Sequence, residues 1–272
     1  MRQTRPKQTR PKQTRMKIKV TFLGTGTSVG TPMIGCNCEV CTSSDPRDFR
    51  LRNSALVNID GKNILIDCGP DFRQQMLREK VTSLDAILIT HLHNDHTIGL
   101  DDIRPFNFMS RQDMPVYTDE FTANNLILRF EYVFGPSPYP GAPSANLILI
   151  DKDTPFEAAG IPIIPLEVIH GKLPVLGFRF GNFAYVTDAK TIAEEEMKKL
   201  EGVGYLALNA LQQTQHHAHL TLEEALEVIA KIKPRKAYIT HISHRMGKQS
   251  AVEPTLPEGV YFAYDGLQVE CG

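Results

Sequence analysis

The sequence has no tryptophan, and it has no apolar run of the roughly 18 residues that a membrane-spanning helix needs. No apolar stretch follows the basic residues at its start, so no secretory signal is predicted. Its five cysteines make an odd number, and three of them fall within six positions. Without an export signal, this pattern favours metal binding over a disulfide framework. We therefore expect a cytoplasmic protein in a reducing setting, with no membrane partner.

The first 15 residues, MRQTRPKQTRPKQTR, contain six Lys or Arg and no acidic residue. Such a segment cannot bury enough apolar surface to offset its ordering entropy, so a disordered basic tail is expected. It could bind nucleic acid weakly, or it could be the remnant of a mis-assigned start. Residues 16–272 retain 24 basic and 31 acidic residues, a net charge of −7 with neutral histidine, which argues against a domain devoted to nucleic acid.

The order of predicted elements indicates an α/β fold in one domain, residues 16–272. Hairpin-rich β structure comes first and alternating β and α elements follow, which predicts sheets covered by helices. The clearest helix begins after a Thr221–Glu224 capping box and carries an apolar stripe. The predicted strands span 17–24, 147–150, 162–169, 175–180, 182–187, 204–210 and 236–241, with hairpins at 54–69 and 261–270. Segment 84–96 is predicted as an apolar strand that runs into a histidine cluster. The predicted helices span 72–80, 119–130, 192–200 and 222–232.

The glycine-rich segment GTGTSVG (24–30) could in principle bind a phosphate group. Nucleotide-binding loops of this kind open directly into a helix. Here Pro32 and the cysteines follow instead, and no Lys-Ser/Thr pair is present. A tight loop that exposes its backbone is the favoured interpretation.

The segment HLHNDH places four possible metal ligands within six residues, His91, His93, Asp95 and His96. They follow a continuous apolar strand, where their desolvation would be costly unless a cation were bound. Three later apolar strands also end in a possible ligand, namely His170, Asp188 and His241. Together these endings predict a metal centre.

In order and type, these residues resemble the ligands of the metallo-β-lactamase superfamily, over nearly all of residues 17–272. The resemblance implies an αββα sandwich with two divalent ions, zinc or manganese, at one edge. It assigns one ion to His91, His93 and His170, and the other to Asp95, His96 and His241, with Asp188 bridging them. Asp67, in LIDCG, matches the superfamily's aspartate beneath the site, a partner for a ligand histidine.

The segment GCNCEVC alone is as compatible with reduced thiols as with zinc. Together with THISH (240–244), it resembles a branch of the superfamily, the phosphodiesterases accessory to carbon–phosphorus lyase. That resemblance implies a structural zinc bound by Cys36, Cys38, Cys41 and His244.

Two cations that share a water lower its pKa and make it an attacking group. A phosphodiester also needs donors for its oxygens and its leaving group. By resemblance, either His217 or His219 supplies this function beside the 222–232 helix, and Asp95 is also expected to be catalytic. Lys172 and Arg104 match basic positions of the phosphodiesterases and are candidates for phosphate binding, although each could be an ordinary surface charge.

We therefore expect a metal-dependent phosphodiesterase that acts on a small phosphodiester such as a cyclic ribose or nucleotide phosphate. The alternatives are an RNA endonuclease of the tRNase Z type, a thioester or lactam hydrolase, and a non-enzymatic metal-binding module. The endonucleases grip RNA with a long arm, and the Gly/Pro loop at 135–143 is short for that role. No sequence pattern specifies the assembly, for which the expectation is a homodimer.

Overall fold

The computed structural model describes residues 16–135, 139 and 141–272. The predicted basic tail (1–15) and four residues of the Gly/Pro loop (136–138 and 140) lie outside the described residues. In the part of the chain that is described, no helix is long and apolar enough to cross a lipid bilayer.

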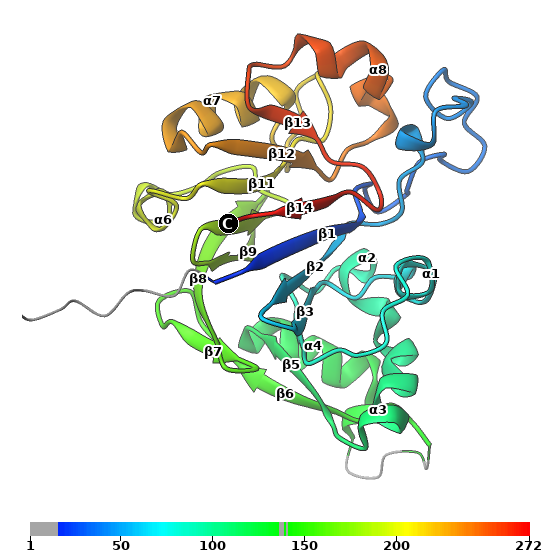
Figure 1. The fold of residues 1–272 in the computed structure, drawn as a ribbon. Coiled ribbons are helices and arrows are strands. Elements are labelled where there is room, and N and C mark those ends of the chain that lie inside the picture. The colour runs from blue at the N-terminus through cyan, green and yellow to red at the C-terminus, as the bar shows by residue number, and fades with distance from the viewer. Residues whose placement is uncertain (1–15, 136–138, 140) are drawn as a thin grey trace, which may run out of the picture.

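Two seven-stranded sheets form the centre of the molecule (Figure 1). The first sheet has the order β14-β1-β2-β3-β4-β5-β6, with bounds Gln268–Glu270, Ile18–Gly24, Ser54–Ile59, Lys62–Ile66, Ala86–Leu88, Met114–Thr118 and Ala145–Leu149. The second has the order β13-β12-β11-β10-β9-β8-β7, with bounds Val260–Phe262, Lys236–Thr240, Tyr205–Asn209, Phe183–Val186, Leu173–Phe180, Ile161–His170 and Phe156–Ala158. The hairpin predicted around Asp60 and Gly61 is confirmed as the antiparallel pair β2–β3.

Helices lie on the outer face of each sheet (Figure 1). Those near the first sheet are α1 (Phe72–Arg78), α2 (Asn94–Thr97), α3 (Arg104–Ser110), α4 (Glu120–Arg129) and α5 (Glu131–Phe134). Those near the second sheet are α6 (Glu194–Lys199), α7 (Leu222–Ile232) and α8 (Gln249–Val252). The capping box predicted for α7 is present, because Thr221 and Glu224 each bind the other's backbone N–H.

Three separate apolar clusters hold these four layers together. Strand residues alternate between them, since successive side chains point to opposite faces of a sheet. Ile64 and Ile66 of β3 pack between the sheets, whereas Leu65 packs against the helices. In the same way Tyr185 of β10 faces the first sheet and Val186 faces α7. The architecture is therefore the predicted single-domain αββα sandwich.

The hairpin predicted at 261–270 is wrong. Strand β13 pairs in parallel with β12 in the second sheet, whereas β14 pairs antiparallel with β1 in the first. Asp265 and Gly266 do form a turn, but their partners lie elsewhere: Gly266 N–H binds Phe22 O, and the Asp265 carboxylate accepts from Leu51 N–H. The segment between the strands therefore crosses from one sheet to the other.

The glycine-rich segment after β1 packs against other backbone rather than opening into a helix. Gly26 forms bridges with both Arg52 and Ile242, and its N–H binds Leu51 O. A Cβ on Gly26 would lie 2.8 Å from Arg50 O, so a larger residue would collide with that carbonyl. The glycines thus allow the close approach of three backbone segments, as the tight-loop interpretation expected.

Candidate active site

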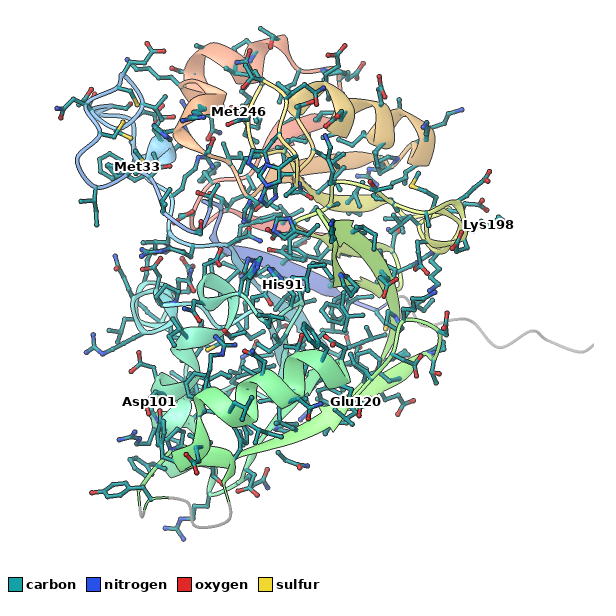
Figure 2. The ribbon with its side chains drawn as sticks, turned by 180° about the vertical axis from the view of Figure 1, so that it is seen from behind. Met33, His91, Asp101, Glu120, Lys198 and Met246 are labelled. Atoms are coloured by element: carbon teal, nitrogen blue, oxygen red, sulfur yellow. The ribbon has the colours of Figure 1, made fainter. Side chains whose placement is uncertain are left out.

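Five strands end at one edge of the sandwich, and a candidate site residue lies at or just beyond each end. Asp67 follows β3, His91 follows β4, His170 ends β8, Asp188 follows β10 and His241 follows β12. Because the carboxyl ends of neighbouring parallel strands meet at one edge, this topology gathers residues that are far apart in the sequence. Figure 2 shows His91 near the centre of the molecule, between the two halves of the sandwich.

Three of these residues have left-handed backbone conformations. The φ angles of Asp67, Asp188 and His241 are 62°, 57° and 52°. Residues other than glycine seldom adopt positive φ, and such strain is characteristic of functional sites. Here it turns each chain sharply out of its strand, so that the side chain lies at the edge of the sheet.

One group of donor atoms faces a common point. His96 Nε2 lies 3.3 Å from Asp95 Oδ2 and 3.4 Å from Asp188 Oδ2, and His241 Nε2 lies 3.3 Å from Asp188 Oδ1. Ligands held about 2.1 Å from one ion lie roughly 3.0–3.4 Å apart. Among the described residues, His96 Nε2 and both ring nitrogens of His241 are buried without a hydrogen-bond partner. Orphaned buried nitrogens at this spacing fit a bound cation.

The ligands predicted for the other ion lie beside this group. His91 Nε2 is 2.9 Å from His93 Nδ1, and the rings of His93 and His170 are 5.3 Å apart. Donor atoms of His91, His96 and Asp188 lie within 4.8 Å of one another, which places Asp188 between the two groups. All seven predicted ligands are therefore brought together in the fold.

Hydrogen bonds fix which nitrogen each of three histidines presents. His96 Nδ1 donates to Asp67 Oδ2 over 2.6 Å, and His170 Nδ1 donates to Ala218 O over 2.8 Å. His91 Nδ1 lies 2.9 Å from Thr90 Oγ1, which in turn donates to Asp67 Oδ2. Each Nδ1–H is thus used, so each Nε2 carries the lone pair. In His91 that lone pair faces His93 Nδ1 at 2.9 Å, and a metal would take the place of this contact. The bond from His96 matches the position predicted for Asp67 beneath the site.

Charges in the site also favour a cation. Burial lowers the pKa of His91 and His241, which keeps these rings neutral. Burial opposes protonation of His96 as well, but Asp67, Asp95 and Asp188 raise its pKa well above the ordinary value. The site therefore attracts a positive charge at His96 Nε2, and a metal can take the place of that proton.

Of the two histidines predicted for catalysis, the fold brings only His219 to the cluster. His219 Nδ1 lies 3.6 Å from Asp188 Oδ1 and, among the described residues, has no hydrogen-bond partner. Its ring lies 4.3 Å from that of His170. Burial and the neighbouring His241 lower the pKa of His219 to about 2. His217 is exposed, and its ring lies 4.5 Å from His216, so it does not join the cluster.

The two predicted phosphate-binding residues lie outside the cluster. Lys172 is exposed in the turn between β8 and β9, two residues beyond His170. Arg104 forms a salt bridge of 2.8 Å with Asp101, which also accepts a hydrogen bond from Tyr132. The charge of Arg104 is therefore shared with Asp101, and phosphate binding by Lys172 and Arg104 stays a prediction.

The cysteines form a second, separate cluster. Donor atoms of Cys36, Cys38, Cys41 and His244 lie within 4.8 Å of one another. His244 Nδ1 is 3.4 Å from Cys36 Sγ and 3.3 Å from Cys38 Sγ. The Cys41 N–H and the His244 ring lower the pKa of Cys38 to about 6, which favours the thiolate that zinc binds.

Two supporting residues were missed by the sequence analysis, Thr90 and Thr187. The Thr187 hydroxyl donates to Asp188 Oδ2 over 2.7 Å. A signal was available, since a threonine directly precedes His91, Asp188 and His241 at the end of three apolar strands.

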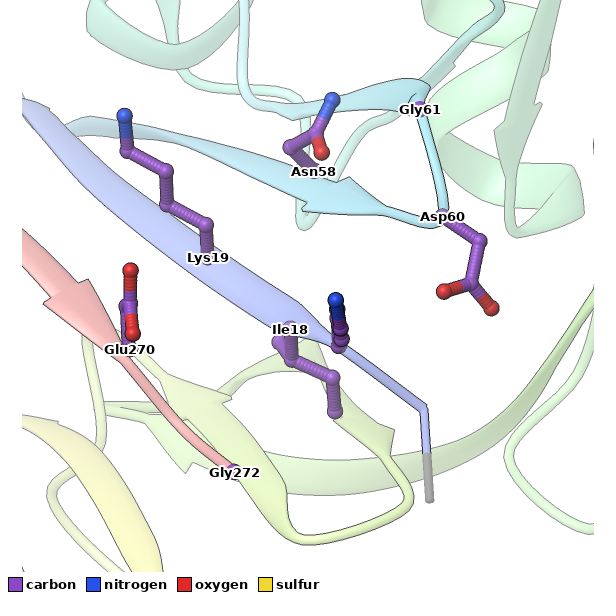
Figure 3. A pocket seen from close by; sticks show the side chains of 8 residues that line it. Ile18, Lys19, Asn58, Asp60, Gly61, Glu270 and Gly272 are labelled. Carbon is purple, nitrogen blue, oxygen red and sulfur yellow. The ribbon is translucent and has the colours of Figure 1, made fainter. Parts of the chain in front are cut away.

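The hollow in Figure 3 lies away from these clusters. Its volume is about 380 Å³, and it lies over β1, β2 and β14. Lys19, Asn58 and Glu270 are direct cross-strand neighbours there, on the solvent side of the sheet. It shares no residue with the histidine cluster, so we do not place the substrate in it.

Comparison with known proteins identifies the family. The model of the β-lactamase superfamily domain matches residues 62–242, a range that includes all seven ligands predicted at the histidine cluster. The chain belongs to the metallo-β-lactamase superfamily. As a member of it with diphosphatase and ribonuclease Z relatives, the chain is a metal-dependent hydrolase.

Three relatives of this superfamily member are informative. A crystal structure described as a new diphosphatase from the PhnP family is 40% identical, with a TM-score of 0.87, and the match covers 94% of this chain and 98% of that one. An octanoyltransferase of Porphyromonas gingivalis is 40% identical over 92% of this chain, but this chain spans only 51% of its length. A ribonuclease Z of Methanosarcina acetivorans is 25% identical over 93% of this chain and 98% of its own length. The chain is therefore PhnP-like within its superfamily.

Proposed function

We propose that the chain is a phosphodiesterase that hydrolyses a small phosphodiester such as a cyclic ribose or nucleotide phosphate. The observation that carries this proposal is the buried Nδ1 of His219, which has no hydrogen-bond partner among the described residues and lies 3.6 Å from the Asp188 carboxylate. His219 lies just before Thr221, the N-cap of the eleven-residue helix α7, where the helix dipole favours an anion. The likeness to the PhnP-family diphosphatase, over 94% of this chain, also supports chemistry at phosphorus.

In this proposal two divalent ions, zinc or manganese, lie between the donor groups described above. One would be held by His91, His93 and His170, and the other by Asp95, His96 and His241, with Asp188 shared between them. The pair of ions would lower the pKa of a water molecule and neutralise phosphate charge. Asp67 and Thr90 bind the Nδ1 atoms of His96 and His91, so that Nε2 of each of these two rings carries the lone pair. The cysteine cluster would hold a separate structural zinc.

The role of His219 follows from its ionisation and position. With a lowered pKa the ring is neutral and carries a single N–H. Such a donor can bind a non-bridging phosphate oxygen whose charge increases in the transition state. Lys172, exposed beside His170, is available for the rest of the anion.

A panel of substrates tests the proposal. Purified protein loaded with zinc or manganese is expected to hydrolyse bis-p-nitrophenyl phosphate and 2′,3′-cyclic AMP. A diphosphate diester belongs in the panel because the PhnP-family relative is described as a diphosphatase. Turnover of a thioester or of precursor transfer RNA, with all phosphodiesters and diphosphates inert, would overturn the proposal.

A pair of variants separates the two candidate histidines. His219→Ala should lower kcat by roughly 10²–10³-fold, the usual effect of removing a donor to a developing charge, and should keep the metal content. His217→Ala should change kcat less than about threefold, because an exposed residue outside the cluster supplies no such donor. The reverse ranking would move the catalytic role to His217.

Acyl-group hydrolysis is a second candidate, and one observation favours it. The Porphyromonas relative, 40% identical over 92% of this chain, is called an octanoyltransferase. Because this chain spans 51% of that protein, the name can refer to its other half. Hydrolysis of an octanoyl thioester at a rate comparable with bis-p-nitrophenyl phosphate would support this candidate.

RNA cleavage is favoured by the ribonuclease Z relative, which matches over 98% of its own length. The net charge of −7 on residues 16–272 works against it, because an RNA backbone binds best to a basic surface. Precursor transfer RNA is therefore included among the substrates of the panel described above. The homodimer and the cytoplasmic setting stay predictions.

A further inference from the structure

We propose that Arg129 is a positioning residue that holds the segment 91–96 in its metal-binding shape. This inference rests on the proposed metal site but concerns a side chain outside it. Arg129 is the last residue of α4, on a different element from every predicted ligand.

The contacts of Arg129 fall between the ligands. Its Nη2 donates to Leu92 O over 2.8 Å, and its Nη1 donates to the side-chain oxygen of Asn94. Leu92 and Asn94 are the two residues of HLHNDH that offer no ligand. One planar guanidinium therefore binds the segment at two points without using any of its predicted ligands.

The segment is also held at other points, since Thr97 Oγ1 donates to His93 O and Cys68 N–H donates to His96 O, but the start of its helix is less well supported. Helix α2 begins at Asn94 with His93 as its N-cap, and no side chain caps its first N–H groups. Helix α2 has four residues and runs directly into a 3-10 helix (Ile98–Ile103), so its uncapped beginning is the end that depends on outside contacts. The chain passes from extended backbone at His93 (φ −61°, ψ 147°) into a helix at Asn94. This change of direction separates His93 and Asp95, which are predicted to bind different ions.

The helix that carries Arg129 is itself held firmly in place. Asp119 caps α4 by accepting a hydrogen bond from Thr122 N–H, and Leu126 is fully buried against the first sheet. Arg129 is partly buried, and this burial lowers the pKa of its guanidinium. Partial burial of an arginine costs free energy unless its N–H groups form hydrogen bonds. Here two of them bind the metal-binding segment.

The test compares Arg129→Met with a matched control, Arg179→Met. Arg179 is also half-buried with a lowered pKa, and it also binds backbone carbonyls, those of Gly181, Lys199 and Glu201, but it lies on β9 away from the histidine cluster. Metal affinity is measured by competition with a chromogenic chelator, and ligand geometry by the visible absorption spectrum of Co²⁺. The activity of the loaded enzyme is recorded separately.

Arg129→Met should weaken metal binding at the histidine cluster by about 10–100-fold and change the Co²⁺ spectrum, as expected for loss of a residue that orients ligands. Arg179→Met should leave both unchanged even if it lowers the melting temperature. Arg129→Lys, which has one donor group in place of a fork, should recover part of the affinity. Asn94→Ala should cost less than Arg129→Met, because the bond to Leu92 O remains.

Unchanged affinity and an unchanged Co²⁺ spectrum in Arg129→Met would overturn the inference, as would equal effects in both methionine variants. If Arg129→Met does not fold, Asn94→Ala decides: wild-type affinity in that variant would overturn the proposal. Failure of the proposed function gives a different pattern, in which the wild type binds metal but leaves phosphodiesters intact. Metal affinity in the variants is still measurable in that case.

Discussion

Three threonines share one place in the fold, each at the end of a strand and directly before a site residue. Thr90, Thr187 and Thr240 are fully buried, and each hydroxyl donates a hydrogen bond. The acceptors are Asp67, Asp188 and Asn53, so the three hydroxyls stabilise the positions from which the ligands project. Because a buried donor without an acceptor is costly, these bonds favour a single arrangement of the strand ends.

Asp67 shows how one buried carboxylate can set the metal affinity. It accepts from Thr90 N–H, Thr90 Oγ1–H and His96 Nδ1–H, and it is fully buried. In Asp67→Asn an amide group would face one of these donors, so metal affinity should fall by about 10–100-fold. Competition with a chelator measures the change. Asp60→Asn is the control, since Asp60 also has positive φ but is exposed in the β2–β3 turn, and an equal loss there would contradict the assignment.

At the scale of elements, close backbone contact determines which glycines are required. A Cβ on Gly24, at the end of β1, would lie 1.9 Å from Arg52 O, a backbone atom that also accepts a hydrogen bond from Gln75 Nε2. Gly61 has φ of +85°, but nothing lies within 4 Å of a Cβ placed there.

Gly24→Ala should therefore lower the free energy of unfolding by more than 3 kcal/mol, above the usual cost of overpacking, about 1–3 kcal/mol. Gly61→Ala should lower it by only about 1–2 kcal/mol, the cost of positive φ in an L-residue. Urea denaturation measures both, and similar losses would show that the β1 end can adjust to a side chain.

Several elements could be predicted because their signals are local. The capping box of α7, the turn between β2 and β3, and the ligands at the ends of apolar strands all lie in short contiguous segments. Strand β5 was missed because it has five residues and a proline at its second position. The sheet membership of β14 could not be read from the chain, because its partner is β1, at the other end of the described chain.

At the scale of the whole molecule, the two clusters link distant parts of the chain. Cys38 and His244 are separated by 206 positions, and their side chains meet at 3.3 Å. Cys38→Ser should remove one zinc and lower the melting temperature by several degrees, since a metal that binds only the folded state stabilises it. Asp188→Ala should do the opposite, losing activity while retaining that zinc and the fold. Elemental analysis with thermal melting measures both, and full zinc content in Cys38→Ser would contradict a structural site there.

Asp265 makes the stability of the whole sandwich depend on pH. It accepts from Thr25 N–H, Thr25 Oγ1–H and Leu51 N–H at the crossover between the sheets, and burial raises its pKa to about 6 despite the nearby Arg78 and Arg50. The ordinary value is 3.8, so the folded state binds a proton that the unfolded state has released between these two pH values. Its contribution to stability is therefore present at low pH and is lost as pH rises through about 6.

The free energy of unfolding of the wild type, minus that of Asp265→Asn, should accordingly fall by about 2 kcal/mol between roughly pH 4.5 and pH 7. Taking the difference cancels the effects of acid on the metal ligands, which both proteins share. Asparagine has no charge to bury, so the variant sets the baseline. Urea denaturation at a series of pH values measures the slope, and a difference that is flat or rises with pH would show that Asp265 is ionised in the folded protein throughout this range.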